Sequence, residues 1–248
     1  MDKNLLSHFL KKIELKLVAK IAFVALMLLW AWGSDFAVIP LILFVIAPSI
    51  AYFSEAQERR HFRASYWILC LLALLGVMMT GGSDGISISS LLIILVFALG
   101  IAVEVGFFRF FFSDRMLVYS IFHIVLIISL FLVFFVAELS LLSVVFLLTA
   151  LTFLFLEFFS LADVRWKGRV LLMSVALGFF GTELAILVRL MPLGFINASA
   201  FLGLTTLLVR DAARAHFDGT LDLPLILRGL AIFLVLSVLI FSVSVWGI

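Results

Sequence analysis

Residues 116–161 read MLVYSIFHIVLIISLFLVFFVAELSLLSVVFLLTALTFLFLEFFSL, an almost continuous apolar stretch in which only Glu138 and Ser140 mark a turn. One helix of this length would be about 69 Å long, more than twice the thickness of the hydrocarbon core of a bilayer. The stretch therefore predicts two membrane-spanning helices, at residues 116–137 and 139–161, with a reversal of the chain at Glu138.

The rest of the chain has the same apolar character. Of its 248 residues, 66% are hydrophobic and 13% are charged, whereas a soluble domain is roughly half apolar and about a quarter charged. This composition excludes a soluble enzyme, a disordered protein, a disulfide-rich secreted domain and a nucleic-acid-binding module. It indicates a polytopic membrane protein.

Runs of about 20 apolar residues, the length that crosses a bilayer, divide the chain into nine predicted spans. Polar turn sequences such as Gly33-Ser34-Asp35 separate some of them, and Pro224 opens the last one. The expected fold is an all-α transmembrane bundle in which residues 17–248 form a single domain. The predicted spans are residues 17–33, 36–53, 64–80, 87–108, 116–137, 139–161, 170–190, 193–209 and 224–246.

The distribution of basic residues predicts the orientation of this bundle. With nine spans, every Lys and Arg except Arg189 falls at one side of the membrane. Because short cytoplasmic loops collect basic residues, the N-terminus is predicted to lie inside and the C-terminus outside. Without the reversal at Glu138, the later basic loops would change sides and the pattern would be lost.

Residues 1–16 form a separate predicted segment. Leu5, Phe9 and Ile13 share one helical face, and most of the lysines lie elsewhere on the helix. This pattern is typical of an amphipathic helix in the inner interface of the membrane, attracted to anionic headgroups. The alternative is that these lysines are a plain cytoplasmic flank of the first span.

Three ionisable residues lie in the inner half of the predicted spans. Glu104 and Glu157 are only four or five residues from the inner ends of their helices, and His123 is seven residues into its span. Ionisable groups at membrane depth are candidates for function. The two glutamates are either ion-paired or extended to the headgroups, or they are part of a cytoplasmic cation or proton entry site. His123 is either a neutral hydrogen-bonding partner between helices or a proton shuttle.

A second candidate cluster lies in the outer half. Glu183 is too far from the inner end of its span to reach it, Arg189 closes the same span, and Asn197 follows after a tight turn. The three residues form either a structural pairing of Glu183 with Arg189 or Asn197, or a substrate or ion site. A stripe of small residues precedes Glu183 and allows close approach of another helix: Ser174, Gly178 and Thr182.

Two functions are compatible with these features. Few polar residues lie within the spans, which favours a non-catalytic structural or accessory subunit of the cell membrane, in contact with lipids, other membrane proteins or further copies of itself. The alternative is a small transporter or lipid-handling permease that uses Glu183, His123 and Glu157. No metal-ligand spacing and no cofactor motif is present, and no nucleic-acid partner is expected. The one cysteine, Cys70, excludes an intrachain disulfide.

Overall fold

A computed structural model of the chain describes residues 63–80, 115–137, 139–161 and 167–243, together with scattered positions between 19 and 46. The predicted interfacial helix at residues 1–16 and the predicted span at 87–108 lie outside the described residues, as do Glu104 and Glu138. The predicted spans at 17–33 and 36–53 are described only at isolated positions, so their bounds stay predictions.

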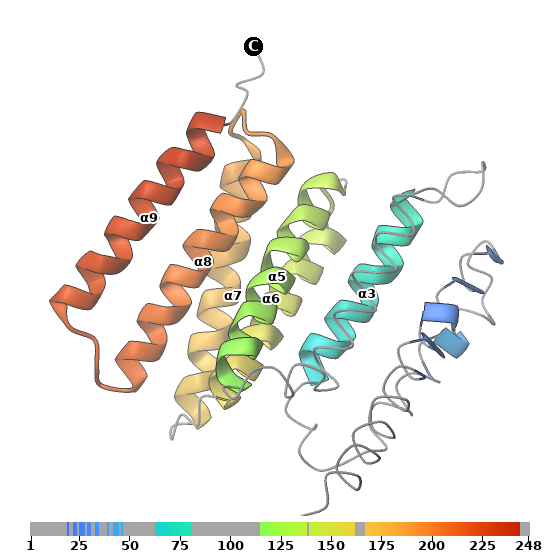
Figure 1. Ribbon diagram of the computed structural model, residues 1–248, viewed down its shortest axis with the longest axis horizontal. Coiled ribbons are helices and arrows are strands. Elements are labelled where there is room, and N and C mark those ends of the chain that lie inside the picture. The colour runs from blue at the N-terminus through green and yellow to red at the C-terminus, as the bar shows by residue number, and fades with distance from the viewer. Residues whose placement is uncertain are drawn as a thin grey trace, which may run out of the picture. The chain divides into compact units, whose positions relative to one another are not determined.

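The described residues are helical and contain no strand. The chain divides into two compact units, Met1–Val118 and Tyr119–Ile248. The first unit contains helix α3 and the first turn of α5. The rest of α5 belongs to the second unit, together with α6 to α9 (Figure 1). The helix bounds are α3 Arg63–Thr80, α5 Arg115–Val136, α6 Leu141–Leu161, α7 Lys167–Arg189, α8 Phe195–Phe217 and α9 Leu223–Val243.

The predicted break in the apolar stretch is confirmed, because α5 ends at Val136 and α6 begins at Leu141. Among the helices that the structure describes, four are long and apolar enough to cross a membrane, which is consistent with an integral membrane protein. Their spanning segments are Tyr119–Val136 in α5, Leu141–Leu161 in α6, Gly168–Arg189 in α7 and Leu223–Ser242 in α9.

Helix α8 differs from its prediction. The expected span ended at residue 209 because Arg210 was assigned to a cytoplasmic loop, but the helix continues to Phe217. The extension is rich in alanine and contains neither Gly nor Pro, so nothing in it stops a helix. The helix ends where Gly219 takes a left-handed conformation, with φ 67°, which a residue without Cβ adopts at no steric cost.

The start of α9 follows the sequence pattern. Pro224 occupies the first turn, where its missing N–H leaves no hydrogen bond unmade. The Asp222 carboxylate accepts a hydrogen bond from the backbone N–H of Leu225 at 3.0 Å, which satisfies one of the free donors of that turn. Pro224 and the hydrogen bond from Leu225 to Asp222 together determine where α9 begins.

Helices α6 and α7 pack most closely, and the predicted small-residue stripe lies in their contact. A Cβ atom added at Gly178 would lie 3.2 Å from the carbonyl oxygen of Leu148 and would collide with the side chain of Thr152. The hydroxyls of Ser174 and Thr182 donate to carbonyls of their own helix, at 2.8 Å in each case. Small residues thus let the backbones of α6 and α7 approach.

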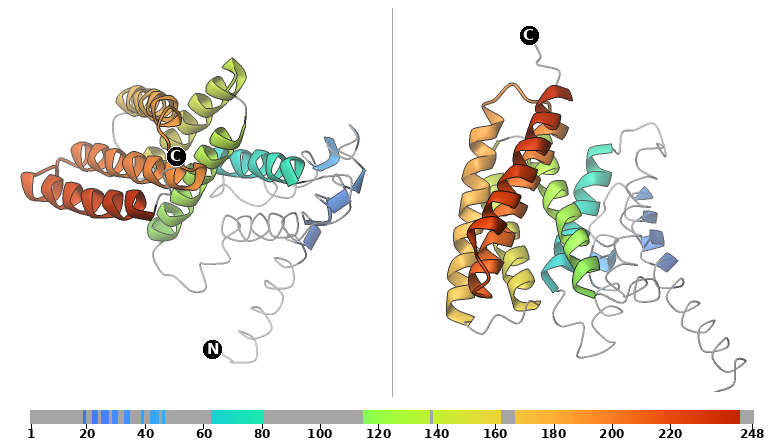
Figure 2. Two further views of the ribbon diagram at one scale, coloured as in Figure 1. Left: turned by 90° about the horizontal axis from the view of Figure 1, so that it is seen from above. Right: turned by 60° about the vertical axis from the view of Figure 1, so that its left-hand side comes forward.

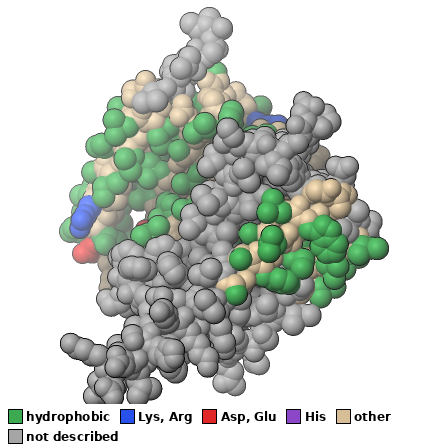
Figure 3. Space-filling model, turned by 45° about the vertical axis from the view of Figure 1, so that its right-hand side comes forward, with side chains coloured by type: hydrophobic (Ala, Val, Ile, Leu, Met, Phe, Trp, Pro, Cys, Tyr) green, Lys and Arg blue, Asp and Glu red, His purple; other side chains and the backbone are tan. Residues whose placement is uncertain are grey.

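Helix α7 also packs on α8, and α8 packs on α9. In both Figure 1 and Figure 2, α9 lies against α8 at one edge of the second unit. Apart from its contact with α8, α9 is largely exposed, and Leu227, Leu234 and Val238 are each more than half exposed. On the face drawn in Figure 3, the described side chains are mainly hydrophobic. An apolar outer surface of this kind suits a helix bundle that is surrounded by lipid.

Candidate functional site

Among the described residues, a group of polar side chains surrounds Arg210, close to the C-terminal end of α8. Arg210 and His123 are buried, with only 2% of Arg210 exposed, whereas Ser120 is half-buried and 62% of the Asp211 side chain is exposed. Because α8 runs on past the predicted end of its span, the guanidinium lies against α5 and α6 and not in a loop. We call this group the Arg210 cluster, and it consists of Ser120 and His123 from α5, Phe158 from α6, and Arg210 and Asp211 from α8.

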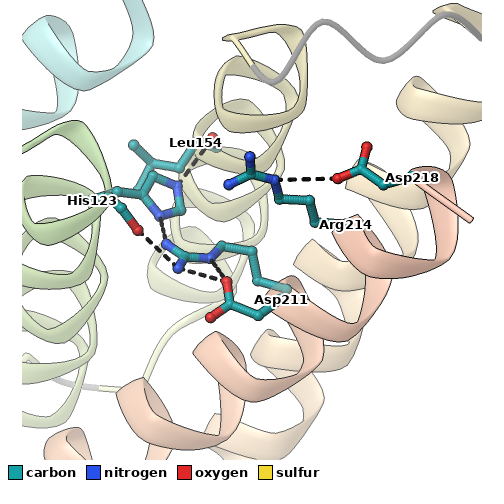
Figure 4. A network of polar contacts seen from close by, with 7 residues as sticks. His123, Leu154, Asp211, Arg214 and Asp218 are labelled. Atoms are coloured by element: carbon teal, nitrogen blue, oxygen red, sulfur yellow. Dashed lines mark hydrogen bonds and ion pairs between the residues drawn. The ribbon is translucent and has the colours of Figure 1, made fainter. Parts of the chain in front are cut away.

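Every nitrogen of the Arg210 guanidinium has a protein partner (Figure 4). Nη1 donates to Nδ1 of His123 at 3.1 Å, and Nη2 donates to Oγ of Ser120 at 3.1 Å. Nε donates to Oδ1 of Asp211 at 2.8 Å, and Nη2 lies 2.7 Å from the same oxygen. The planar group also lies over the ring of Phe158, 4.2 Å from its centre. Arginine suits such a site because its fork of donors stays flat and can stack on an aromatic ring.

The two contacts of His123 define its tautomer. Its ring is fully buried, and Nε2 lies 3.1 Å from the carbonyl oxygen of Leu154. A carbonyl only accepts hydrogen bonds, so Nε2 must carry a hydrogen. On the other side, Nδ1 faces a guanidinium, which only donates, so Nδ1 must be unprotonated. The geometry therefore requires a neutral imidazole. Through it, His123 of α5 contacts both α6 and α8.

A second polar contact lies beside the cluster and involves the sequence-predicted Glu157. The hydroxyl of Tyr119 donates to Oε1 of Glu157 at 2.8 Å, and the glutamate is 6% exposed. The ring of Tyr119 lies 5.8 Å from that of His123, and both rings contact Phe158. The structure thus brings two sequence-predicted residues, His123 and Glu157, into one region between the start of α5 and the end of α6.

Arg189 has a different partner from those expected. Its Nη1 and Nη2 atoms donate to the carbonyl oxygens of Phe134 and Ala137, both at 2.9 Å, and its guanidinium lies 5.7 Å from the centre of the Phe134 ring. The last carbonyls of a helix lack partners within the helix and carry partial negative charge. Arg189 from α7 therefore caps the C-terminal end of α5.

The remaining members of the predicted outer cluster do not meet. Glu183 is exposed on α7, and Asn197 is half-buried in the first turn of α8. Within the described ranges, Glu183 forms neither of the two expected pairs, with Arg189 or with Asn197. The reason is geometric: Arg189 reaches across to α5, and Glu183 lies on the face of α7 that points away from the packed helices.

Arg210 is the functional candidate that sequence reasoning missed. Its position after a run of apolar residues resembles that of an ordinary cytoplasmic loop cation. The alanine-rich, Gly-free continuation of the sequence as far as His216 was the available signal that the helix does not end there. The two partners of Arg210 on α5, His123 and Ser120, are 87 and 90 residues away in the chain, so no local pattern identifies them.

Neither the Arg210 cluster nor its surroundings present a set of metal ligands. Among the described residues, no group of three or more His, Cys, Asp or Glu side chains converges. Comparison of the chain with known proteins finds no matching family model, no matching curated protein and no matching solved structure.

Proposed function

We propose that this chain is a non-catalytic, multi-pass subunit of the cell membrane, with a structural or accessory role in contact with lipids and other membrane proteins. The single observation that carries the proposal is the condition of Arg210. Its charge is buried, each guanidinium nitrogen donates to a protein acceptor, and an aromatic ring covers one face. A group in this state holds helices together, because four of its five N–H donors point at acceptors of the protein.

The Arg210 cluster supports this role through three helices. It joins α8 to α5 through His123 and Ser120, and His123 in turn joins α5 to α6. Polar contacts between membrane helices contribute about 0.6–2 kcal/mol each. Buried polar groups of this kind also favour one arrangement of helices over alternatives, because a shifted register would leave a charge without a partner. A rigid bundle with an apolar exterior suits a subunit that presents a surface.

A transporter or lipid-handling permease is the second candidate. It is favoured by the proximity of Glu157, Tyr119 and His123, since a carboxylate, a phenol and an imidazole in a row are groups that can relay a proton. Its weakness is that Glu183 is exposed on α7 and does not join the buried groups. A permease that used all three residues in one pathway would need them to face one cavity.

One experiment separates the two candidates. The full chain is reconstituted in vesicles that contain a fluorescent pH indicator, and proton flux and thermal stability are compared for the wild type, Glu157→Gln and His123→Gln. A structural role predicts flux equal to that of protein-free vesicles and lower melting temperatures for both variants. Flux above that background, abolished by either substitution with the melting temperature unchanged, would overturn the proposal.

A second measurement addresses the accessory role itself. Purification from the native membrane in mild detergent is followed by mass-spectrometric identification of the proteins and lipids that remain bound. The proposal predicts a membrane protein or lipid in a fixed molar ratio to the chain. A chain that purifies alone, with no lipid enriched over the bulk membrane, would contradict an accessory role.

A further inference from the structure

Glu183 lies on a continuous exposed stripe of α7. The face that carries Gly178 and Thr182 is buried against neighbouring helices, and the opposite face is uncovered. Along it, exposed residues recur every three or four positions, which is the spacing of a helix face that packs against another helix. We call this face the Glu183 stripe, and it consists of Leu172, Val175, Phe179, Phe180, Glu183 and Leu187.

The position of Glu183 along α7 makes its exposure costly. The apolar span of this helix is Gly168–Arg189, and Glu183 is six residues before its end, which is about 9 Å along the axis. A charged side chain within a bilayer is rare unless it faces a partner or a water-filled cavity. A glutamate is too short to carry its charge over that distance to the headgroups, as a lysine or arginine can. An ionised Glu183 at this depth is stable only beside a partner that neutralises the carboxylate.

The neighbours of Glu183 favour a cation. Phe179 and Phe180 precede it by four and three positions, so they lie on the same face, and they are 54% and 41% exposed. Long side chains on a helix lean toward the preceding turn, which brings the carboxylate of Glu183 toward these two rings. Ammonium and guanidinium groups are attracted both to a carboxylate and to an aromatic face. The same site offers nothing to an anion.

A second copy of this chain does not supply that cation from its described ranges. Arg189 is the only basic residue near the same end of α7, and both of its terminal nitrogens donate to α5. Arg169 lies fourteen residues earlier on α7, about 21 Å away along the axis. Arg228 lies near the start of α9, which corresponds to the other end of the bundle under the predicted topology. A symmetric dimer would instead bring two carboxylates together.

We infer that the Glu183 stripe is a docking site for a transmembrane helix of another protein that carries a Lys or Arg at the depth of Glu183. The inference rests on the proposed accessory role and specifies the chemistry of the partner. The ion pair forms in lipid, where Glu183 and the partner's cation neutralise each other, and the apolar residues of the stripe pack against the partner helix.

The test uses the full chain in its native membrane, with a benzophenone amino acid in place of Leu187, which is 57% exposed and one turn after Glu183. The same crosslinker in place of Leu234 on α9, 60% exposed, is the positional control. The crosslinked peptide is sequenced by mass spectrometry. Support requires a transmembrane helix of another protein with a Lys or Arg, together with a crosslinking yield that falls at least about tenfold in Glu183→Gln.

The matched control and the exchange of charges complete the test. Asp222→Asn removes a carboxylate from the loop before α9 and should leave the yield unchanged. Glu183→Lys should abolish the crosslink, and replacing the partner's basic residue by Glu in that variant should restore it. If Glu183→Gln fails to reach the membrane, Phe179→Leu tests the docking site in its place. This variant keeps the charge of Glu183 but removes an aromatic ring, so the crosslinking yield should fall severalfold.

Several results would overturn the inference. They are a yield in Glu183→Gln within twofold of the wild type, a crosslink to a second copy or within the chain itself, and a partner helix with no basic residue. Failure of the proposed accessory role has a different signature, which is proton flux in the vesicle assay that depends on Glu157 or His123. Failure of the docking site and failure of the accessory role can therefore be told apart.

Discussion

The Nη1 atom of Arg210 lies 3.1 Å from Nδ1 of His123, although 87 positions separate the two residues in the chain. The contact joins α8 to α5 through a buried donor and a buried acceptor. Replacing either residue leaves the polar group of the other without its partner. A buried donor left without an acceptor costs about 1–3 kcal/mol, and more when the donor is charged.

His123→Phe should therefore lower the free energy of unfolding by about 1–3 kcal/mol, because the ring volume stays and the acceptor for Arg210 is lost. Thermal melting of the purified chain in detergent measures the effect. His216→Phe is the matched control, since His216 lies exposed on α8 and should change stability by less than about 0.5 kcal/mol. Equal melting temperatures for the two variants would contradict a supporting role for His123.

Arg210→Lys is expected to be destabilising although it keeps the charge. A lysine ammonium cannot donate to Ser120, His123 and Asp211 in one plane and stack flat on Phe158. Arg214→Lys is the control, because Arg214 is 39% exposed and its contact with Asp218 is 3.6 Å long, and exposed pairs contribute about 0–1 kcal/mol. The two melting temperatures should differ by several degrees, with Arg210→Lys the lower.

Arg189→Gln should loosen the C-terminal turn of α5. Two carbonyl oxygens, of Phe134 and Ala137, lose their donors, and a helix C-terminus loses a favourable cation worth about 0.3–2 kcal/mol. Hydrogen–deuterium exchange should rise at residues 130–137 while α9 keeps its protection. In the matched control, Arg228→Gln at the exposed start of α9, exchange in α5 should stay at the wild-type rate.

Gly178→Ala should weaken the packing of α6 on α7, because the added methyl group meets Thr152 and the carbonyl oxygen of Leu148. Overpacking of this kind costs about 1–3 kcal/mol. Gly168→Ala on the same helix adds the same methyl group where nothing lies within 4 Å, so it should not lower stability. Thr152→Ala in the Gly178→Ala background should recover part of the lost stability. No recovery would contradict a steric clash between the added methyl group and Thr152.

The nine-span topology predicts that the two ends of the chain lie on opposite sides of the membrane. Single cysteines introduced at Met1 and Ile248, in a Cys70→Ala background, should react with a membrane-impermeant maleimide from opposite sides. A cysteine at Ser140, in the short connection between α5 and α6, should share the side of Ile248. Labelling of both ends from one side would exclude an odd number of crossings.

The sequence predicted the helices whose limits follow from local physics. The reversal near Glu138 follows from bilayer thickness, and the start of α9 follows from Pro224. It also predicted that Gly178 lies at a close helix contact, although it did not name Thr152 as the neighbour. His123 and Glu157 were recognised as candidates because ionisable residues are rare in apolar runs. Each of these inferences uses residues within a few turns of one another.

The pairing of charges was decided by the tertiary structure alone. Arg189 shares a helix with Glu183, yet it donates to the end of α5, and Arg210 belongs to a helix that the sequence predicted to end at residue 209 but that continues to Phe217. The free energy of a charge in an apolar environment depends on which acceptors surround it in space, and those acceptors come from helices 50 to 90 residues away. Length and hydropathy, which are local sums, determined where the helices lie in the chain. The contacts between helices, which depend on how they pack, determined that Arg210 is buried and that Glu183, within its apolar span, is exposed.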